Sequence, residues 1–168
     1  MYEASRSLTP KIPEPNQPTV RPRILLLAER GFIGSYVQRQ ALSEGTEEVV
    51  VSRALSDDLP TTQQLQWRAL PLETMLHSGD WLPHLQGIDV VINCVGILRQ
   101  RLGEHYEDLH HRMPTALAQA CAKRGVRLIH TSALGLHEGA KSRFLSSKLR
   151  GEQAIWPVAR ITASCARA

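Results

Sequence analysis

Short apolar runs alternate along this chain with longer stretches in which apolar residues recur every three or four positions. Short apolar runs that end at polar or glycine breaks are typical of strands buried in a parallel sheet. Four such runs predict core strands at 24–27, 49–51, 88–92 and 127–130, and helical patterns occupy 32–42, 104–124 and 141–155. Strands that alternate with helices predict an α/β fold with a doubly wound parallel sheet.

Weaker patterns add three short elements. The sequence predicts a third strand at 67–70, a short helical segment at 81–85 and the beginning of another strand at 158–162. Pro114 interrupts the longest helical pattern, so we expect a kink or a division of that helix. Gly125 supplies its C-terminal stop.

A glycine turn joins the first predicted strand to the first predicted helix, with the sequence Gly31-Phe32-Ile33-Gly34. A helix N-terminus presents free N–H groups and partial positive charge, which suit a pyrophosphate. Gly31 would let the backbone approach the phosphates, and Gly34 would let the helix pack close to the strand. This strand, turn and helix therefore predict a dinucleotide-binding unit.

Two further segments follow predicted strands at the edge where open α/β sheets bind ligands. Arg53 follows the second strand, and an arginine there can accept a 2′-phosphate, which favours NADP(H) over NAD(H). The alternative for Arg53 is a solvated charge at a strand end. Asn93, Val95 and Gly96 end another strand and would line the cofactor cleft, although Asn93 fits a strand cap equally well.

The composition narrows the class of protein. A chain of 168 residues, 42% hydrophobic and 21% charged, suffices for one domain with a core. The net charge of +4 is scattered rather than clustered, which argues against a nucleic-acid partner. No apolar run is long enough to span a bilayer, and the N-terminus lacks a signal-peptide core. We therefore expect a cytoplasmic protein, and the sequence points to no particular protein partner.

The cysteines and histidines do not predict a metal site. The cysteines are three, far apart and without CxxC spacing, which argues against a disulfide framework or a zinc site. His105, His110 and His111 lie in the longest helical pattern, but no convergent set of ligands is evident. We expect these histidines to be solvated.

The first 22 residues contain five prolines and few large apolar side chains. Such a segment buries too little apolar surface to offset its ordering entropy, so 1–22 is expected to be a disordered leader. It would serve either as a docking segment or as an extension without a role. The remaining residues, 23–168, would form the folded domain.

Four short motifs follow one another along the chain in the order found in a known protein family. They are Gly31-Phe32-Ile33-Gly34, Asn93-Cys94-Val95-Gly96, His130-Thr131-Ser132-Ala133-Leu134-Gly135, and Ser147-Lys148 with Gly151-Glu152. Over about 23–152 the chain resembles the extended and atypical short-chain dehydrogenase/reductase superfamily. It is most similar to the NAD-dependent epimerase/dehydratase-like branch, which includes relatives of the complex I accessory subunit that carries a bound nucleotide.

The resemblance implies a Rossmann-like fold and a role for each matching position. Gly31, Phe32, Ile33 and Gly34 would hold the pyrophosphate. Ser132 would match the serine that hydrogen-bonds a substrate oxygen. Lys148 would match the lysine that binds the nicotinamide ribose and lowers the pKa of the catalytic tyrosine.

The chain also departs from the family pattern. The first fingerprint glycine falls on Ala28, and Glu29 adds negative charge near the expected phosphates. The catalytic tyrosine falls on Phe144, whose ring cannot pass a proton. The sequence alone does not place Tyr106, a possible substitute, in the cleft. Relatives continue for another hundred residues or more, so we expect a truncated domain that lacks its C-terminal part.

These features predict an NAD(P)-binding protein that binds nucleotide without efficient catalysis. The first alternative is an NAD(P)-dependent oxidoreductase or epimerase, which would need a proton donor and a substrate pocket. The second alternative is a fragment in which the altered glycine turn binds no nucleotide.

Overall fold

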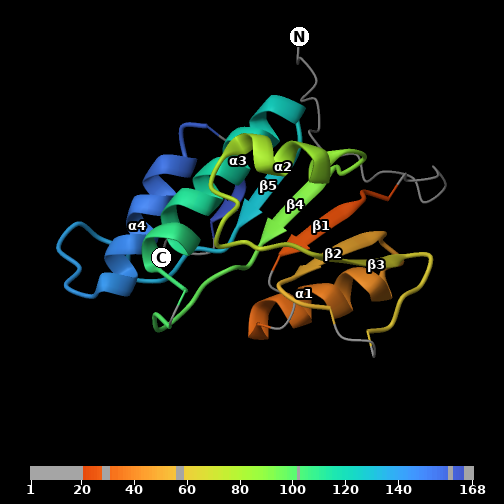
Figure 1. Ribbon diagram of the computed structural model, residues 1–168, viewed down its shortest axis with the longest axis horizontal. Coiled ribbons are helices and arrows are strands. Elements are labelled where there is room, and N and C mark those ends of the chain that lie inside the picture. The colour runs from red at the N-terminus through yellow and green to blue at the C-terminus, as the bar shows by residue number, and fades with distance from the viewer. Residues whose placement is uncertain (1–20, 28–30, 56–58, 102, 159–160, 165–168) are drawn as a thin grey trace, which may run out of the picture.

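The computed structural model describes residues 21–27, 31–55, 59–101 and 103–158, together with the backbone of 161–164. Its centre is a six-stranded parallel sheet in the order β3-β2-β1-β4-β5-β6. Figure 1 labels its strands β1 to β5. The predicted parallel sheet is confirmed. The strands are β1 (Ile24–Leu27), β2 (Glu48–Ser52), β3 (Leu65–Ala69), β4 (Val90–Asn93), β5 (Arg127–His130) and β6 (Ile161–Ser164).

β1 is the central strand, and its neighbours bring distant segments to one edge of the sheet. Leu27 is in register with Val51 of β2 on one side and with Asn93 of β4 on the other. All four residues of β1 are buried, as expected of a strand covered on both faces. The carboxyl ends of β1, β2 and β4 therefore meet at one edge of the sheet.

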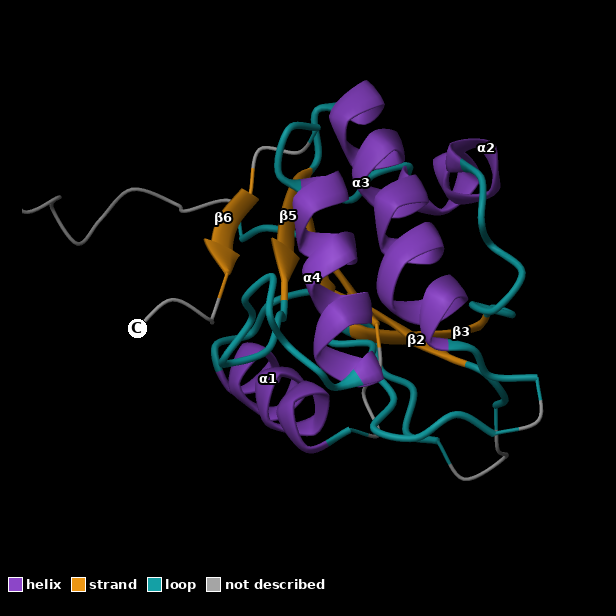
Figure 2. Cartoon of the chain, turned by 90° about the vertical axis from the view of Figure 1, so that its left-hand side faces the viewer, coloured by secondary structure: helices purple, strands orange, loops and turns teal. Residues whose placement is uncertain are grey.

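Helices cover the two faces of the sheet unequally. α1 (Phe32–Ser43) lies on one face, whereas α2 (Ser78–Trp81), α3 (Met113–Arg124) and α4 (Arg143–Ile155) lie on the other (Figure 2). A 3₁₀ turn, Leu82–Leu85, follows α2. The larger core lies between the sheet and α3, where Trp81 and Leu117 are fully buried.

The segment predicted as one helix at 104–124 is divided in the structure. Glu107–Arg112 forms a π-helical turn, and α3 begins at Met113 with Pro114 in its first turn. Proline has no N–H to donate, and its ring crowds the carbonyl four residues earlier, which is that of His110. The widened turn before Pro114 accommodates this defect, so the expected division of the helix is confirmed.

α4 packs directly on this widened turn. A Cβ atom built on Gly151 would lie within 1.8 Å of the carbonyl oxygen of His110. Only glycine permits this separation of the two backbones. Gly151 therefore sets how closely α4 approaches the π-helical turn.

Some predictions fall outside the described residues. Residues 1–20 of the predicted leader belong to this group, as do Ala28 and Glu29 in the glycine turn. Within the described part of the chain, no helix is long and apolar enough to cross a membrane.

Candidate functional site

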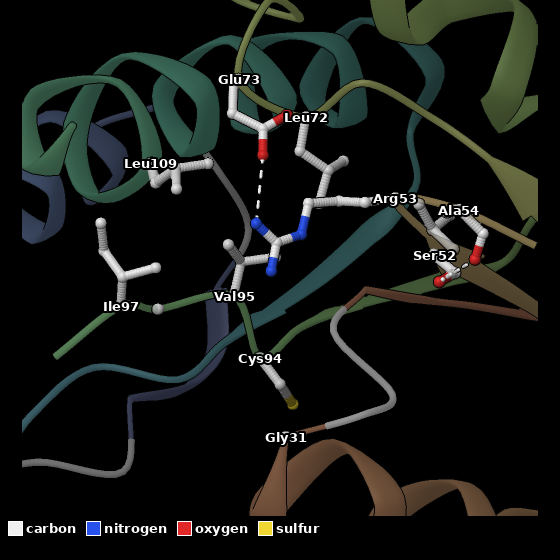
Figure 3. Close-up of a pocket in the computed structure, with 12 residues that line it drawn as sticks. Gly31, Ser52, Arg53, Ala54, Leu72, Glu73, Cys94, Val95, Ile97 and Leu109 are labelled. Carbon is white, nitrogen blue, oxygen red and sulfur yellow. Dashed lines mark hydrogen bonds and ion pairs between the residues drawn. The ribbon is translucent and has the colours of Figure 1, made fainter. Parts of the chain in front are cut away.

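A cleft of about 470 Å³ opens at the carboxyl edge of the sheet, between Gly31 and the residues at the ends of β2 and β4 (Figure 3). Four of the predicted cofactor-binding residues line it, namely Gly31, Arg53, Val95 and Gly96. The remaining lining residues are Val51, Ser52, Ala54, Leu72, Glu73, Cys94, Ile97 and Leu109.

The start of α1 forms one wall of the cleft. Gly31 is the N-cap residue, with an extended backbone (φ −77°, ψ 157°) and no side chain to cap the first-turn N–H groups. Those groups have no partner within the helix and are available to an anion. Gly34 is buried, whereas Phe32 is 93% exposed and Ile33 is 49% exposed. The backbone of this turn, rather than the Phe32 and Ile33 side chains, faces the cleft.

Arg53 lies at the predicted end of β2, but its guanidinium has protein partners. Nη1 is 3.5 Å from Glu73 Oε1 and also forms an ion pair with Glu104. The hydrogen bond that Arg53 donates to Glu104 is the main reason that the pKa of Arg53 is raised. The solvated-charge alternative therefore holds only in part, since Arg53 is exposed yet paired.

Asn93 is fully buried and acts on its own loop. Its Oδ1 accepts a hydrogen bond from Val95 N at 3.0 Å, so its Nδ2 donates to His130 Nδ1 at 3.1 Å. These contacts favour the strand-cap alternative for the Asn93 side chain. Val95 and Gly96, which it positions, line the cleft.

The same bonds fix the tautomer of His130. Because Nδ1 accepts from Asn93, the ring proton is on Nε2, which is buried and has no hydrogen-bond partner among the described residues. Burial, followed by the charges of Lys148 and His110, lowers the pKa of His130 to about 3. His130 is therefore a neutral residue of the interior.

Lys148 reaches from α4 to the ends of β4 and β5. It is 5% exposed, and its Nζ donates to Val95 O at 3.1 Å and Thr131 O at 3.3 Å. Desolvation lowers its pKa to about 8. A Cβ atom on Gly96 would lie 3.2 Å from this Nζ, so the loop backbone passes close over the ammonium.

The other two positions implied by the catalytic motif have contacts of their own. Ser132 Oγ donates to Glu152 Oε2 at 2.7 Å. The Phe144 ring packs edge-on against His110 at 5.4 Å and Tyr106 at 6.3 Å between centroids. The structure thus places Tyr106 beside Phe144, although its hydroxyl donates to Leu98 O at 2.7 Å.

The expectation of solvated histidines is wrong for His110, which is fully buried. Its Nε2 accepts from Ile97 N at 3.0 Å, so the proton is on Nδ1, which donates to Ser147 Oγ at 2.9 Å. Burial, followed by the charge of Lys148, lowers the pKa of His110 to about 3. His110 shares a helical face with Met113 and Leu117, a spacing that signals burial.

The other two histidines behave differently. His105 is exposed, and His111 is partly exposed with its Nδ1 2.7 Å from Glu107 Oε1. Within the described residues, no group of three or more histidine, cysteine or acidic side chains is arranged to hold a metal ion.

Three features define an α/β protein of the Rossmann type. They are the strand order, the helix that begins at a glycine, and the cleft at the carboxyl edge of the sheet. Residues 24–150 match the family described as "NAD dependent epimerase/dehydratase family". The chain belongs to this family.

Relatives share part of the sequence of this chain, and solved structures share its fold. A mouse protein, "NADH dehydrogenase [ubiquinone] 1 alpha subcomplex subunit 9, mitochondrial", is 29% identical over 135 residues, 74% of this chain and 34% of its own length. Ceramide reductase from Caulobacter vibrioides is 27% identical over 138 residues, 79% of this chain and 41% of its own. The Bordetella bronchiseptica enzyme WbmG, solved in complex with NAD, superposes with a TM-score of 0.69 and 17% identity over 86% of this chain and 52% of its own. The chain therefore spans about a third of the mouse relative and about half of WbmG.

Proposed function

We propose that this chain binds NAD(H) or NADP(H) in the cleft and does not catalyse efficiently. The observation that carries the proposal is the cleft itself, where the uncapped start of α1 faces the ends of β2 and β4. Doubly wound sheets bind dinucleotides at this edge, with the pyrophosphate at the helix N-terminus. Membership of an NAD-dependent family and the NAD complex of WbmG support the same ligand.

The contacts of the catalytic-motif positions support the absence of efficient catalysis. Phe144 has no hydroxyl, Ser132 is engaged by Glu152, and Lys148 is engaged by two backbone carbonyls. General acid–base catalysis typically contributes about 10²–10⁴-fold to a rate, so loss of the proton donor has a large effect.

One observation favours the alternative of an active oxidoreductase or epimerase. The Tyr106 ring lies against Phe144. Its phenol is the same chemical group that a tyrosine at position 144 would supply. Its hydrogen bond to Leu98 O would have to break before the phenol could serve a substrate. We therefore rank this function second.

The preference between the two cofactors and the cellular compartment stay predictions. The preference for NADP(H) rests on Arg53, whose ion pairs with Glu73 and Glu104 now weigh against it. A cytoplasmic location remains the expectation from the sequence, while the mouse relative is named as mitochondrial.

Titration of the chain with NADH and NADPH, followed by nucleotide fluorescence and calorimetry, tests the proposal. Gly31→Glu places a carboxylate at the mouth of the helix, and the extended backbone at Gly31 accepts any residue. This variant should bind at least about tenfold more weakly than the parent chain, because like charges repel at the phosphate position. Gln38→Glu adds the same charge about two turns further along α1 and is the matched control.

Two results would contradict the proposal. Equal affinities of the parent and Gly31→Glu would show that nucleotide binds elsewhere or not at all, as expected of a non-binding fragment. Turnover of a small carbonyl substrate at an ordinary enzymatic rate, abolished by Tyr106→Phe, would favour the active enzyme instead.

A further inference from the structure

Arg53 extends from the end of β2 into the cleft, where the adenosine ribose of a dinucleotide would lie. Its side chain is 59% exposed, so the guanidinium is within reach of a ligand. Figure 3 shows the guanidinium between the walls of the cleft, turned toward Glu73.

Two carboxylates from different parts of the chain hold this guanidinium. Glu73 follows β3, whereas Glu104 follows β4 and closes a small antiparallel bridge with Arg101. The Glu104 side chain is only 13% exposed, and that of Glu73 is 24% exposed. The three charges sum to −1, so the group as a whole is not a ready-made phosphate site.

A 2′-phosphate would change this balance unfavourably. To bind it, Arg53 would have to leave Glu104, and a mostly buried carboxylate would lose its counter-charge. The phosphate would also approach two like charges, which act as a repulsive element against that ligand. A free 2′-hydroxyl adds no charge and can donate a hydrogen bond to either carboxylate.

We propose that Glu104 is the residue that determines nucleotide selectivity: by holding Arg53, it makes the cleft select NAD(H) over NADP(H). This inference rests on the proposed dinucleotide binding. The nucleotide preference is thereby assigned to a residue after β4 rather than to Arg53 alone. Arg53 and Glu104 are 51 positions apart, so no local sequence pattern pairs them.

Titrations of the full chain with NADH and NADPH test this assignment through the ratio of the two affinities. The parent chain should bind NADH more tightly. Glu104→Gln should free Arg53 for the 2′-phosphate and shift the ratio toward NADPH by about tenfold or more, the effect expected of one charge-assisted contact. Glu44→Gln removes the same charge at the end of α1 and should leave the ratio unchanged. Adding Arg53→Gln to Glu104→Gln should cancel the shift.

The possible outcomes separate this inference from the proposed function. A parent chain that prefers NADPH, or a Glu104→Gln shift no larger than that of Glu44→Gln, overturns the inference while dinucleotide binding stands. Absence of binding to both nucleotides in every folded variant overturns both. If Glu104→Gln does not fold, the parent ratio and Glu73→Gln, which should shift the ratio in the same direction, still decide the question.

Discussion

The Nζ atom of Lys148 lies 3.1 Å from the carbonyl oxygen of Val95, so one ammonium ties α4 to the loop that lines the cleft. Its second bond, to Thr131 O at 3.3 Å, extends the same tie to the end of β5. The resemblance implies that this lysine binds a cofactor ribose, but here it also holds two backbone carbonyls in place. Because Lys148 is buried, its contribution to stability depends on pH.

The free energy of unfolding should rise with pH between about 8 and 10.5 because of Lys148. Its pKa is lowered to about 8 in the folded chain from 10.5, so in this window the unfolded chain holds a proton that the folded chain has lost. The gain should be about 1.4 kcal/mol per pH unit relative to Lys148→Met. Urea unfolding at several pH values measures the difference between the two chains. Burial raises the pKa of Cys121 to about 12, and this opposite effect cancels in the difference because both chains contain it. Lys123→Met removes an exposed ammonium as a control, and parallel curves for the parent and Lys148→Met would refute the prediction.

Two buried histidines should make the chain sensitive to acid. The pKa values of His110 and His130 are lowered to about 3 from 6.5, so the unfolded chain takes up two more protons between these limits. Stability is fully present above pH 6.5 and should fall on acidification by about 1.4 kcal/mol per pH unit for each histidine. His110→Gln should reduce this slope by about 1.4 kcal/mol per pH unit, the share of one histidine, in unfolding titrations from pH 7 to pH 4. His105→Gln, at an exposed position, should leave the slope as in the parent.

Glu48 should act in the opposite sense. This buried residue of β2 has both carboxylate oxygens without a hydrogen-bond partner among the described residues, and desolvation raises its pKa to about 7 from 4.5. Between those values the folded chain keeps a proton that the unfolded chain has lost, so stability falls as pH rises through the window. Glu48→Gln should therefore raise the free energy of unfolding at pH 8 by about 1–3 kcal/mol, with little gain near pH 4. The neighbouring exposed variant Glu47→Gln is the control, and an equal gain from it would argue against a buried charge at Glu48.

Gly151→Ala should destabilise the fold strongly. The added methyl would lie 1.8 Å from the carbonyl oxygen of His110, a backbone atom that cannot move alone. Separating α4 from the π-helical turn should cost on the order of 1–3 kcal/mol or more. Thermal and urea unfolding measure the loss. Gly79→Ala in α2 has no atom within 4 Å of the new Cβ and serves as the control, so losses of equal size would exclude the close approach as the cause.

The sheet could be predicted from the sequence because each strand is a short apolar run, as in β1, where Leu25, Leu26 and Leu27 are all fully buried. The place of Arg53 could be predicted for a related reason. It directly follows a strand, and the carboxyl ends of parallel strands share one edge of the sheet.

The partners of those residues could not be predicted in the same way. Glu73 and Glu104 stand 20 and 51 positions from Arg53, so no local pattern relates them to it. The sequence places Glu104 at the start of a helical pattern, whereas the structure has it in a bridge with Arg101. The π-helical turn before Pro114 could not be predicted for another reason. Proline indicates a break in the helix, but it does not indicate which side chain of the widened turn is buried. The inward orientation of His110 depends on the packing of α4 against this turn.

The central position of β1 also bears on the order of events during synthesis. Its first neighbour, β2, follows soon after it, but the residues of its other neighbour, β4, pair with residues 66 positions earlier, as Ile24 does with Val90. Loop-closure entropy must be overcome before that pairing forms, and non-local pairings of this kind slow folding. On the ribosome, β1 must therefore wait with one edge unpaired until the chain has emerged beyond Asn93. During that interval the backbone N–H and C=O groups on that edge of β1 are open to chaperones and to neighbouring nascent chains.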